Sequence, residues 1–143
     1  MAITKVTSAL LNSTALTSKA FGTSSIMIGD DSTGTIDAAN YNTGLGVDVF
    51  AALTTGDNNL AIGYAALTAN TTGASNVAVG SSALDANTTA SFNTAIGEAS
   101  LSANTTGASN TAVGNGALYT NTTASNNTAV GKYALLYNTT GRQ

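Results

Sequence analysis

The side chains that most enzymes use for catalysis are scarce in this sequence. It contains no His and no Cys, and Glu98 is its only glutamate. General acid–base catalysis, thiol chemistry and zinc binding depend on those residue types. The sequence therefore predicts a protein that is not an enzyme and has neither catalytic residues nor a cofactor.

The charged residues also form no recognisable binding site. Asp30, Asp31 and Asp37 lie close together, but they lack the nonapeptide spacing of calcium-binding solenoids, so we interpret them as part of a solvated loop. The sequence contains four Lys and Arg and seven Asp and Glu, which gives a net charge of -3. Nucleic-acid affinity comes largely from neutralising phosphates. We therefore expect no metal and no nucleic-acid partner, and no apolar stretch reaches the roughly 18 residues of a membrane span.

The composition indicates that something other than a bulky core orders the chain. Ala, Thr, Asn, Gly and Ser make up about two thirds of the 143 residues. So few large apolar residues are typical of disorder, but disorder usually also needs a high net charge. That charge is missing here.

A repeat of seventeen residues supplies the missing order. From Asn59 the segment NLAIGYAALTANTTGAS is followed by four further copies without an insertion, and weaker copies run through Gly46 and Gly29. We divide the chain into an N-terminal docking segment (residues 1–25), degenerate first coils (26–57) and regular repeats (58–143).

Residues seventeen apart form columns of like side chains, and these columns are the candidate structural sites. The columns are Gly63, Gly80, Gly97, Gly114 and Gly131; Ala61, Ala78, Ala95, Ala112 and Ala129; Leu67, Leu84, Leu101, Leu118 and Leu135; Asn70, Asn87, Asn104, Asn121 and Asn138; and Asn59, Asn76, Asn93, Asn110 and Asn127. We expect the Leu column and the column of Ile62, Val79, Ile96, Val113 and Val130 to fill the interior, and the Asn columns to form amide ladders.

The repeat predicts an all-β fold. A Gly and an Asn-Thr-Thr in every seventeen residues leave no room for a useful helix. We expect a short strand around Ala61–Gly63, a second strand over Ala65–Thr68, and a turn at Asn-Thr-Thr, where Asn tolerates left-handed backbone angles. Stacking such units gives a parallel β-solenoid, or β-roll, of 17-residue coils.

A single solenoid of this kind would bury little apolar surface. Each coil offers one Leu, one Ile or Val and a few Ala, which barely offsets a backbone ordering cost of about 1–2 kcal/mol per residue. Association would bury a second face, so we expect a homotrimer, intertwined or packed side by side.

The repeats resemble those of known surface appendages. The run NTAVGNGAL at Asn110–Leu118, the NTTG at Asn138–Gly141 and the opening MAITKVT resemble bacteriophage tail-fibre and related virion appendage proteins. The core Asn-x-Ala-Ile/Val-Gly is similar to the head repeats of trimeric autotransporter adhesins, which implies a β-roll trimer. The seventeen-residue period is longer than the usual autotransporter head repeat, which favours the virion.

The resemblance implies a structural fibre or spike segment that projects from a phage particle and aids host attachment. Ile3, Val6, Leu10 and Leu11 are the candidates for docking to other virion proteins. A host receptor or glycan is a further expected partner. Tyr64, Tyr119, Tyr133 and Tyr137 could contact a glycan, although covering neighbouring coils is the simpler role for these side chains.

Two other functions remain open. One is a bacterial surface trimeric adhesin head, which the same coils would serve. The other is an ice-binding solenoid, suggested by the Thr columns that begin at Thr71 and Thr72. Adjacent residues of a strand point to opposite faces, whereas a flat ice-binding array needs Thr at alternate positions.

Overall fold

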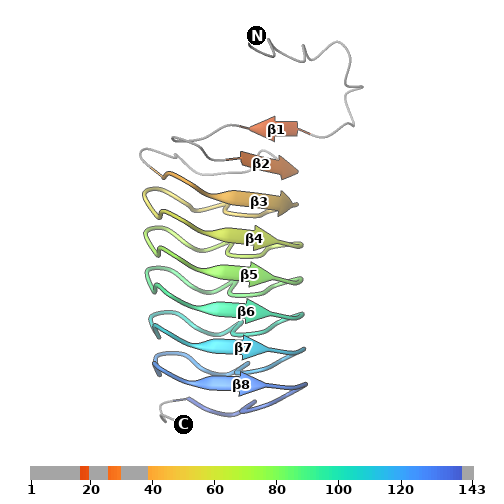
Figure 1. Ribbon diagram of the computed structural model, residues 1–143, viewed down its shortest axis with the longest axis vertical. Helices are drawn as coiled ribbons and strands as arrows, with labels where there is room; N and C mark the ends of the chain where they lie inside the picture. Colours follow the sequence, from red (N-terminus) through yellow and green to blue (C-terminus); the bar gives the residue numbers. More distant parts are fainter. Residues whose placement is uncertain (1–16, 20–25, 30–38, 140–143) are drawn as a thin grey trace.

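The computed structural model describes residues 17–19, 26–29 and 39–139. Eight short strands form one sheet in their order along the chain. They are β1 (Thr17–Lys19), β2 (Ile26–Gly29), β3 (Thr43–Gly46), β4 (Leu60–Ile62), β5 (Val77–Val79), β6 (Thr94–Ile96), β7 (Thr111–Val113) and β8 (Thr128–Val130). Figure 1 shows them stacked along the long axis of the molecule. The described residues contain no helix, so the predicted all-β class is confirmed.

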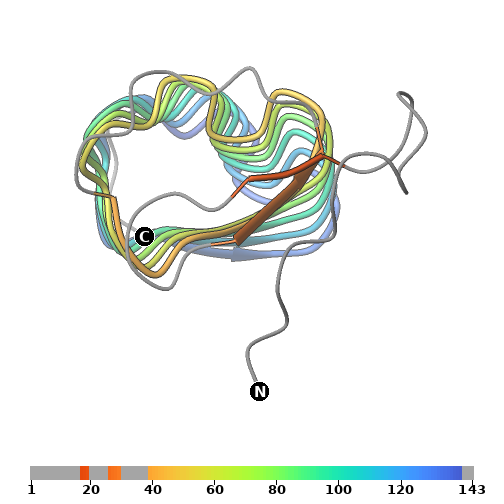
Figure 2. The same ribbon diagram turned by 90° about the horizontal axis from the view of Figure 1, so that it is seen from above.

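The strands pair one repeat apart. β2 to β8 are parallel, and β1 runs antiparallel to β2. Leu60 lies opposite Val77, and Gly29 lies opposite Gly46, so each partner is seventeen positions away. Viewed from above, the successive coils superpose around a common axis (Figure 2). This geometry confirms the predicted parallel β-solenoid with one coil per repeat.

The predicted second strand over Ala65–Thr68 is a turn-rich segment instead. Ala65 and Leu67 have φ angles of +56° and +52°, and the equivalent residues of the later coils are also left-handed. The segment still bonds to both neighbouring coils, since the N–H of Ala65 donates to the carbonyl of Val47 and that of Leu67 to the carbonyl of Ala83. We call residues 64–69 and their equivalents in other coils the turn wall.

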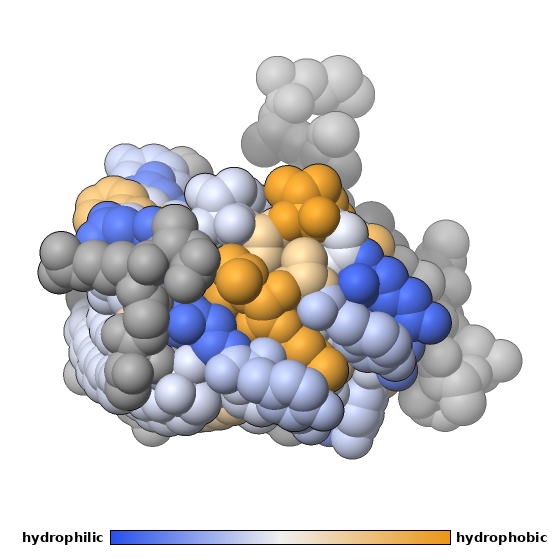
Figure 3. Space-filling model, turned by 90° about the horizontal axis from the view of Figure 1, so that it is seen from below, coloured by the Kyte–Doolittle hydropathy of each residue, from blue (hydrophilic) through white to orange (hydrophobic). Residues whose placement is uncertain are grey.

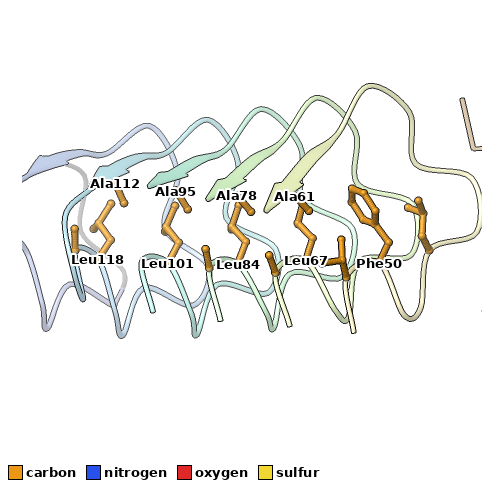
Figure 4. Close-up of a cluster of buried hydrophobic side chains, with 14 of the residues drawn as sticks. Phe50, Ala61, Leu67, Ala78, Leu84, Ala95, Leu101, Ala112 and Leu118 are labelled. Carbon is orange, nitrogen blue, oxygen red and sulfur yellow. The ribbon is translucent and has the colours of Figure 1, made fainter. Parts of the chain in front are cut away.

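The core is a narrow column between the strands and the turn wall (Figure 4). The Ala at the centre of each strand from β4 to β7 points toward a Leu of the turn wall, as Ala61 does toward Leu67. Both side chains are buried in this pair, and Phe50 takes the place of Leu in the preceding coil. The predicted role of the Leu column is therefore confirmed for Leu67, Leu84, Leu101 and Leu118, which are all fully buried.

The Ile and Val column does not fill the interior, and this expectation is wrong. Successive side chains of a strand point to opposite faces, so an inward Ala61 places Leu60 and Ile62 on the outside. Ile96 is 40% exposed and Val130 is 70% exposed. The space opposite each Leu accommodates a methyl group, which accounts for Ala at the inward position of β4 to β8.

Candidate interaction surfaces

An uncharged strip of aliphatic and Thr side chains follows the outer face of the sheet. It consists of the first and third residues of β3 to β8, and we call it the strand wall. The third positions are Leu45, Ile62, Val79, Ile96, Val113 and Val130, and the first positions are Thr43, Leu60, Val77, Thr94, Thr111 and Thr128. These residues are half-buried or exposed, and none carries a charge. The third column is aliphatic throughout, whereas four of the six residues in the first column are Thr. Aliphatic side chains gathered along one accessible face are typical of an interaction surface.

The Gly column marks the corner where each strand meets the turn wall. Gly97 has a φ of +133°, a region that side-chain-bearing residues rarely occupy. A Cβ atom built on Gly97 would lie 2.5 Å from the carbonyl carbon of Gly114 in the next coil. The corner therefore needs glycine both for its backbone angle and for the close approach of the next coil.

One Asn column forms the expected amide ladder. Nδ2 of Asn87 donates to Oδ1 of Asn70 at 3.0 Å, and Nδ2 of Asn104 donates to Oδ1 of Asn87 at 3.1 Å. The ladder continues to Asn121 and Asn138. Asn70, Asn87, Asn104 and Asn121 are fully buried, so the ladder replaces apolar packing on one side of the interior.

The other Asn column bonds mainly to the main chain, although Nδ2 of Asn127 also donates to Oδ1 of Asn110 at 3.0 Å. Oδ1 of Asn59 accepts the backbone N–H of Asn76 at 2.9 Å, and its Nδ2 donates to the carbonyl of Gly73 at 2.9 Å. The same carbonyl accepts Nδ2 of Asn70, so both columns meet on one oxygen. The sequence revealed the stacking of these residues but not this cross-bracing, because the column pattern does not show which atoms face each other.

The two Thr columns differ in their hydrogen bonding. Oγ1 of Thr71 donates to the carbonyl of Thr88 at 3.0 Å, and Thr54, Thr88 and Thr105 repeat this bond to the following coil. The neighbouring column, which includes Thr72, is exposed. The first column therefore stabilises stacking, and the second lies on the surface.

The tyrosines proposed as contact residues are all exposed. Tyr64 is 59% exposed, Tyr119 43%, Tyr133 53% and Tyr137 82%. All four lie on the turn wall in four different columns, Tyr64 in the coil that contains β4 and the other three in the last two coils. The backbone beside the last three is joined, since the N–H of Thr120 donates to the carbonyl of Leu136 and the N–H of Leu136 donates to the carbonyl of Tyr133. Tyr64 lies several coils away.

The apolar core reaches the C-terminal end of the described solenoid. Figure 3 shows this end with hydrophobic residues in the middle of the face and hydrophilic residues around them. Ala134 and Leu135 pack against the core there and are only partly buried.

The remaining candidates from the sequence do not form a site in the described part of the chain. Ile3, Val6, Leu10 and Leu11 lie outside the described residues, as do Asp30, Asp31 and Asp37. In residues 17–19, 26–29 and 39–139, no three His, Cys, Asp or Glu side chains come together as a possible metal site. The same residues include no helix that is long and apolar enough to cross a membrane.

Comparison with protein-family models, with curated proteins and with solved structures found no match for this chain. The fold and the columns define its class directly. It is a parallel β-solenoid repeat protein whose described surfaces are a strand wall, a turn wall and an exposed Thr column.

Proposed function

We propose that this protein is a structural segment of a trimeric fibre or spike that projects from a phage virion and aids attachment to the host. The observation that carries the proposal is the strand wall. It places an uncharged strip, aliphatic along its third column, on every coil from β3 to β8, with Leu45 47% exposed and Val130 70% exposed. Water contact on this strip is removed if three copies pack their strand walls around a common axis.

The repeat spacing supports a second copy of the same chain as the occupant of the strand wall. Stacked strands lie about 4.8 Å apart, so side chains of one column recur at that interval. Another copy has the same interval, and its columns stay in step with those of the first over the whole length. β-Branched side chains such as Val79, Ile96 and Val113 would then project from both surfaces at the same regular interval.

The internal bonding suits a fibre that carries load. Each coil is joined to the next by strand pairing, by the Asn ladder and by the Thr71-type hydroxyl bonds. No buried side-chain nitrogen or oxygen among the described residues is without a hydrogen-bond partner. This bonding favours a spacer over an ice-binding surface, because one of the two Thr columns uses its hydroxyls to hold the stack together.

The oligomeric state is tested by light scattering of the full chain after size-exclusion chromatography. We expect three times the chain mass of 14.0 kDa. Val113→Asp places a charge on the strand wall and should reduce the mass to that of one chain. Thr106→Asp is the matched control, since it places the same charge on the exposed Thr column and should leave the trimer intact. A single-chain mass for the unmodified protein would remove the basis of the proposal.

The location on a virion needs a separate experiment. Immunogold labelling of purified particles from the producing strain should mark the tail or its appendages. Labelling of the bacterial surface with unlabelled particles would instead support the alternative function, a bacterial adhesin head.

A further inference from the structure

The turn wall changes character in the last two coils. Three of its partly exposed columns are those of Ala65, Thr68 and Ala69, and the next two coils place only Ser, Ala or Asp there. A fourth, mostly exposed column runs from Tyr64 to Lys132. In the last two coils the same three columns contain aromatic rings. These are Tyr133 in the first column, Tyr119 in the second and Tyr137 in the third. Because the repeat is stable with small residues in these columns, stacking does not require the rings.

The position of Tyr133 is fixed by the coil above it. Gly116 occupies the same column one coil earlier, and a Cβ atom on Gly116 would lie 2.6 Å from Cδ1 of the Tyr133 ring. The ring therefore packs against the backbone of Gly116 in space that a larger residue would fill. It is still 53% exposed, so much of its surface remains available.

A positive charge accompanies this ring. Nζ of Lys132 lies 5.0 Å from the centroid of Tyr133, within the range of a cation–π interaction. Lys132 is the only Lys or Arg between residues 39 and 139. Its ammonium group retains hydrogens that can donate to a ligand.

We propose that Tyr119, Lys132, Tyr133 and Tyr137 form a binding site for an acidic oligosaccharide that contains uronic acid. Exposed aromatic rings can stack on the C–H faces of pyranose rings, and an ammonium group can form a charge-assisted hydrogen bond with a sugar carboxylate. Exposed rings on an outer wall suit a chain of sugars that lies along the surface better than a single small molecule. The biological meaning of this inference rests on the proposed attachment function.

The site lies on the turn wall, whereas the proposed trimer contact lies on the strand wall. The two proposals can therefore fail independently. A loss of sugar binding leaves the mass of the assembly unchanged, and a single-chain mass leaves the sugar titration interpretable.

The test is a calorimetric titration of the full chain with tetragalacturonate, with maltotetraose as the neutral sugar of equal length. We expect saturable binding of the acidic probe and weaker binding of the neutral one. Tyr133→Ala should reduce the association constant about tenfold. Lys132→Asn should remove the preference for the acidic sugar.

The repeat itself supplies substitutions that the fold accepts. Ala99 occupies the column of Tyr133 in another coil with a φ of +53°, and Asn115 occupies the column of Lys132. Tyr64→Ser is the control, because it removes an exposed ring outside the site and Ser81 already occupies its column. The control should bind like the unmodified chain. The proposal is overturned if the unmodified chain shows no saturable binding, or if Tyr64→Ser weakens binding as much as Tyr133→Ala. It is also overturned if Tyr133→Ala changes the mass of the assembly, because the patch would then be a contact between copies.

Discussion

Nδ2 of Asn104 donates one hydrogen bond to Oδ1 of Asn87 in the coil above, at 3.1 Å, and another to the carbonyl of Gly107 in its own coil, at 2.9 Å. Oδ1 of Asn104 in turn accepts Nδ2 of Asn121 at 3.0 Å. One buried amide thus joins three successive coils and closes the turn of its own. A polar side chain here performs the ordering role that a large apolar residue performs in most cores.

Replacing Asn104 by Leu should therefore destabilise the solenoid strongly. Leu has a similar shape but leaves Oδ1 of Asn87 and one side-chain N–H of Asn121 unpaired, whereas the carbonyl of Gly107 keeps its bond from Asn93. We expect a loss of about 3 kcal/mol or more, because each buried polar group left unpaired costs about 1–3 kcal/mol. Urea unfolding followed by circular dichroism measures the change. Asn115→Leu is the control, since Nδ2 of Asn115 bonds to Glu98 in an exposed pair, and its stability should stay within about 0.5 kcal/mol of the unmodified chain.

Two residues of the Gly column separate the effect of a steric clash from the effect of backbone strain alone. Gly97→Ala should prevent regular stacking, because the new methyl group would lie 2.5 Å from the carbonyl carbon of Gly114. Gly131 has a similar φ of +123°, but its nearest neighbour to a new Cβ is Cβ of Ala134 at 4.0 Å. Gly131→Ala should therefore cost only the strain of the backbone, about 1–3 kcal/mol. Thermal unfolding should show a much lower midpoint for Gly97→Ala, and equal midpoints would contradict the close approach of successive corners.

The inward and outward faces of the strands can be distinguished by one substitution on each. Ala95→Val adds two methyl groups opposite Leu101 in the filled core and should destabilise the chain by about 1–3 kcal/mol. Thr94→Val changes the neighbouring outward residue to one already present in that column as Val77, so little change is expected. Chemical denaturation of both variants provides the measurement. A larger effect at Thr94 would show that the two faces have been assigned in the wrong order.

The two Thr columns should respond differently to the same substitution. Thr71→Val removes the hydroxyl that bonds to the carbonyl of Thr88 and should cost about 1 kcal/mol. Thr72→Val lies on the exposed neighbouring column and should be nearly neutral. The shift in melting temperature of each variant, compared under one buffer condition, tests this difference. Equal shifts would argue against a stacking role for the hydroxyl.

The sequence predicts the coil but not its cross-section. The seventeen-residue spacing is visible in the Gly and Asn columns, and like residues must meet when equal units stack, so the parallel register follows directly. In a three-residue strand, either the middle residue or the two outer residues point inward, and the repeat spacing does not decide between these two arrangements. Size and hydrophobicity favour Ile62 over Ala61 for the interior, yet the narrow gap opposite Leu67 accepts only the smaller residue.

The turn wall was harder to predict for a different reason. Ala65–Thr68 contains residues that strands, helices and turns all accept, and left-handed angles at Ala65 and Leu67 are unusual for such side chains. The coils above and below impose these angles through hydrogen bonds such as that from the Leu67 N–H to Ala83. Interactions of this kind have no local signature. The position of Tyr119, Tyr133 and Tyr137 on one wall depends on this cross-section, which the sequence does not show.

The uniform register of the coils also bears on how such a gene can change. Loss or duplication of any whole number of seventeen-codon units joins a strand end to an equivalent strand end, so the flanking columns remain continuous. A rod of this design can be lengthened or shortened in steps of about 4.8 Å through recombination between its own repeats. The length of the solenoid can therefore vary between related genes while the strand wall and the turn wall of the remaining coils stay unchanged.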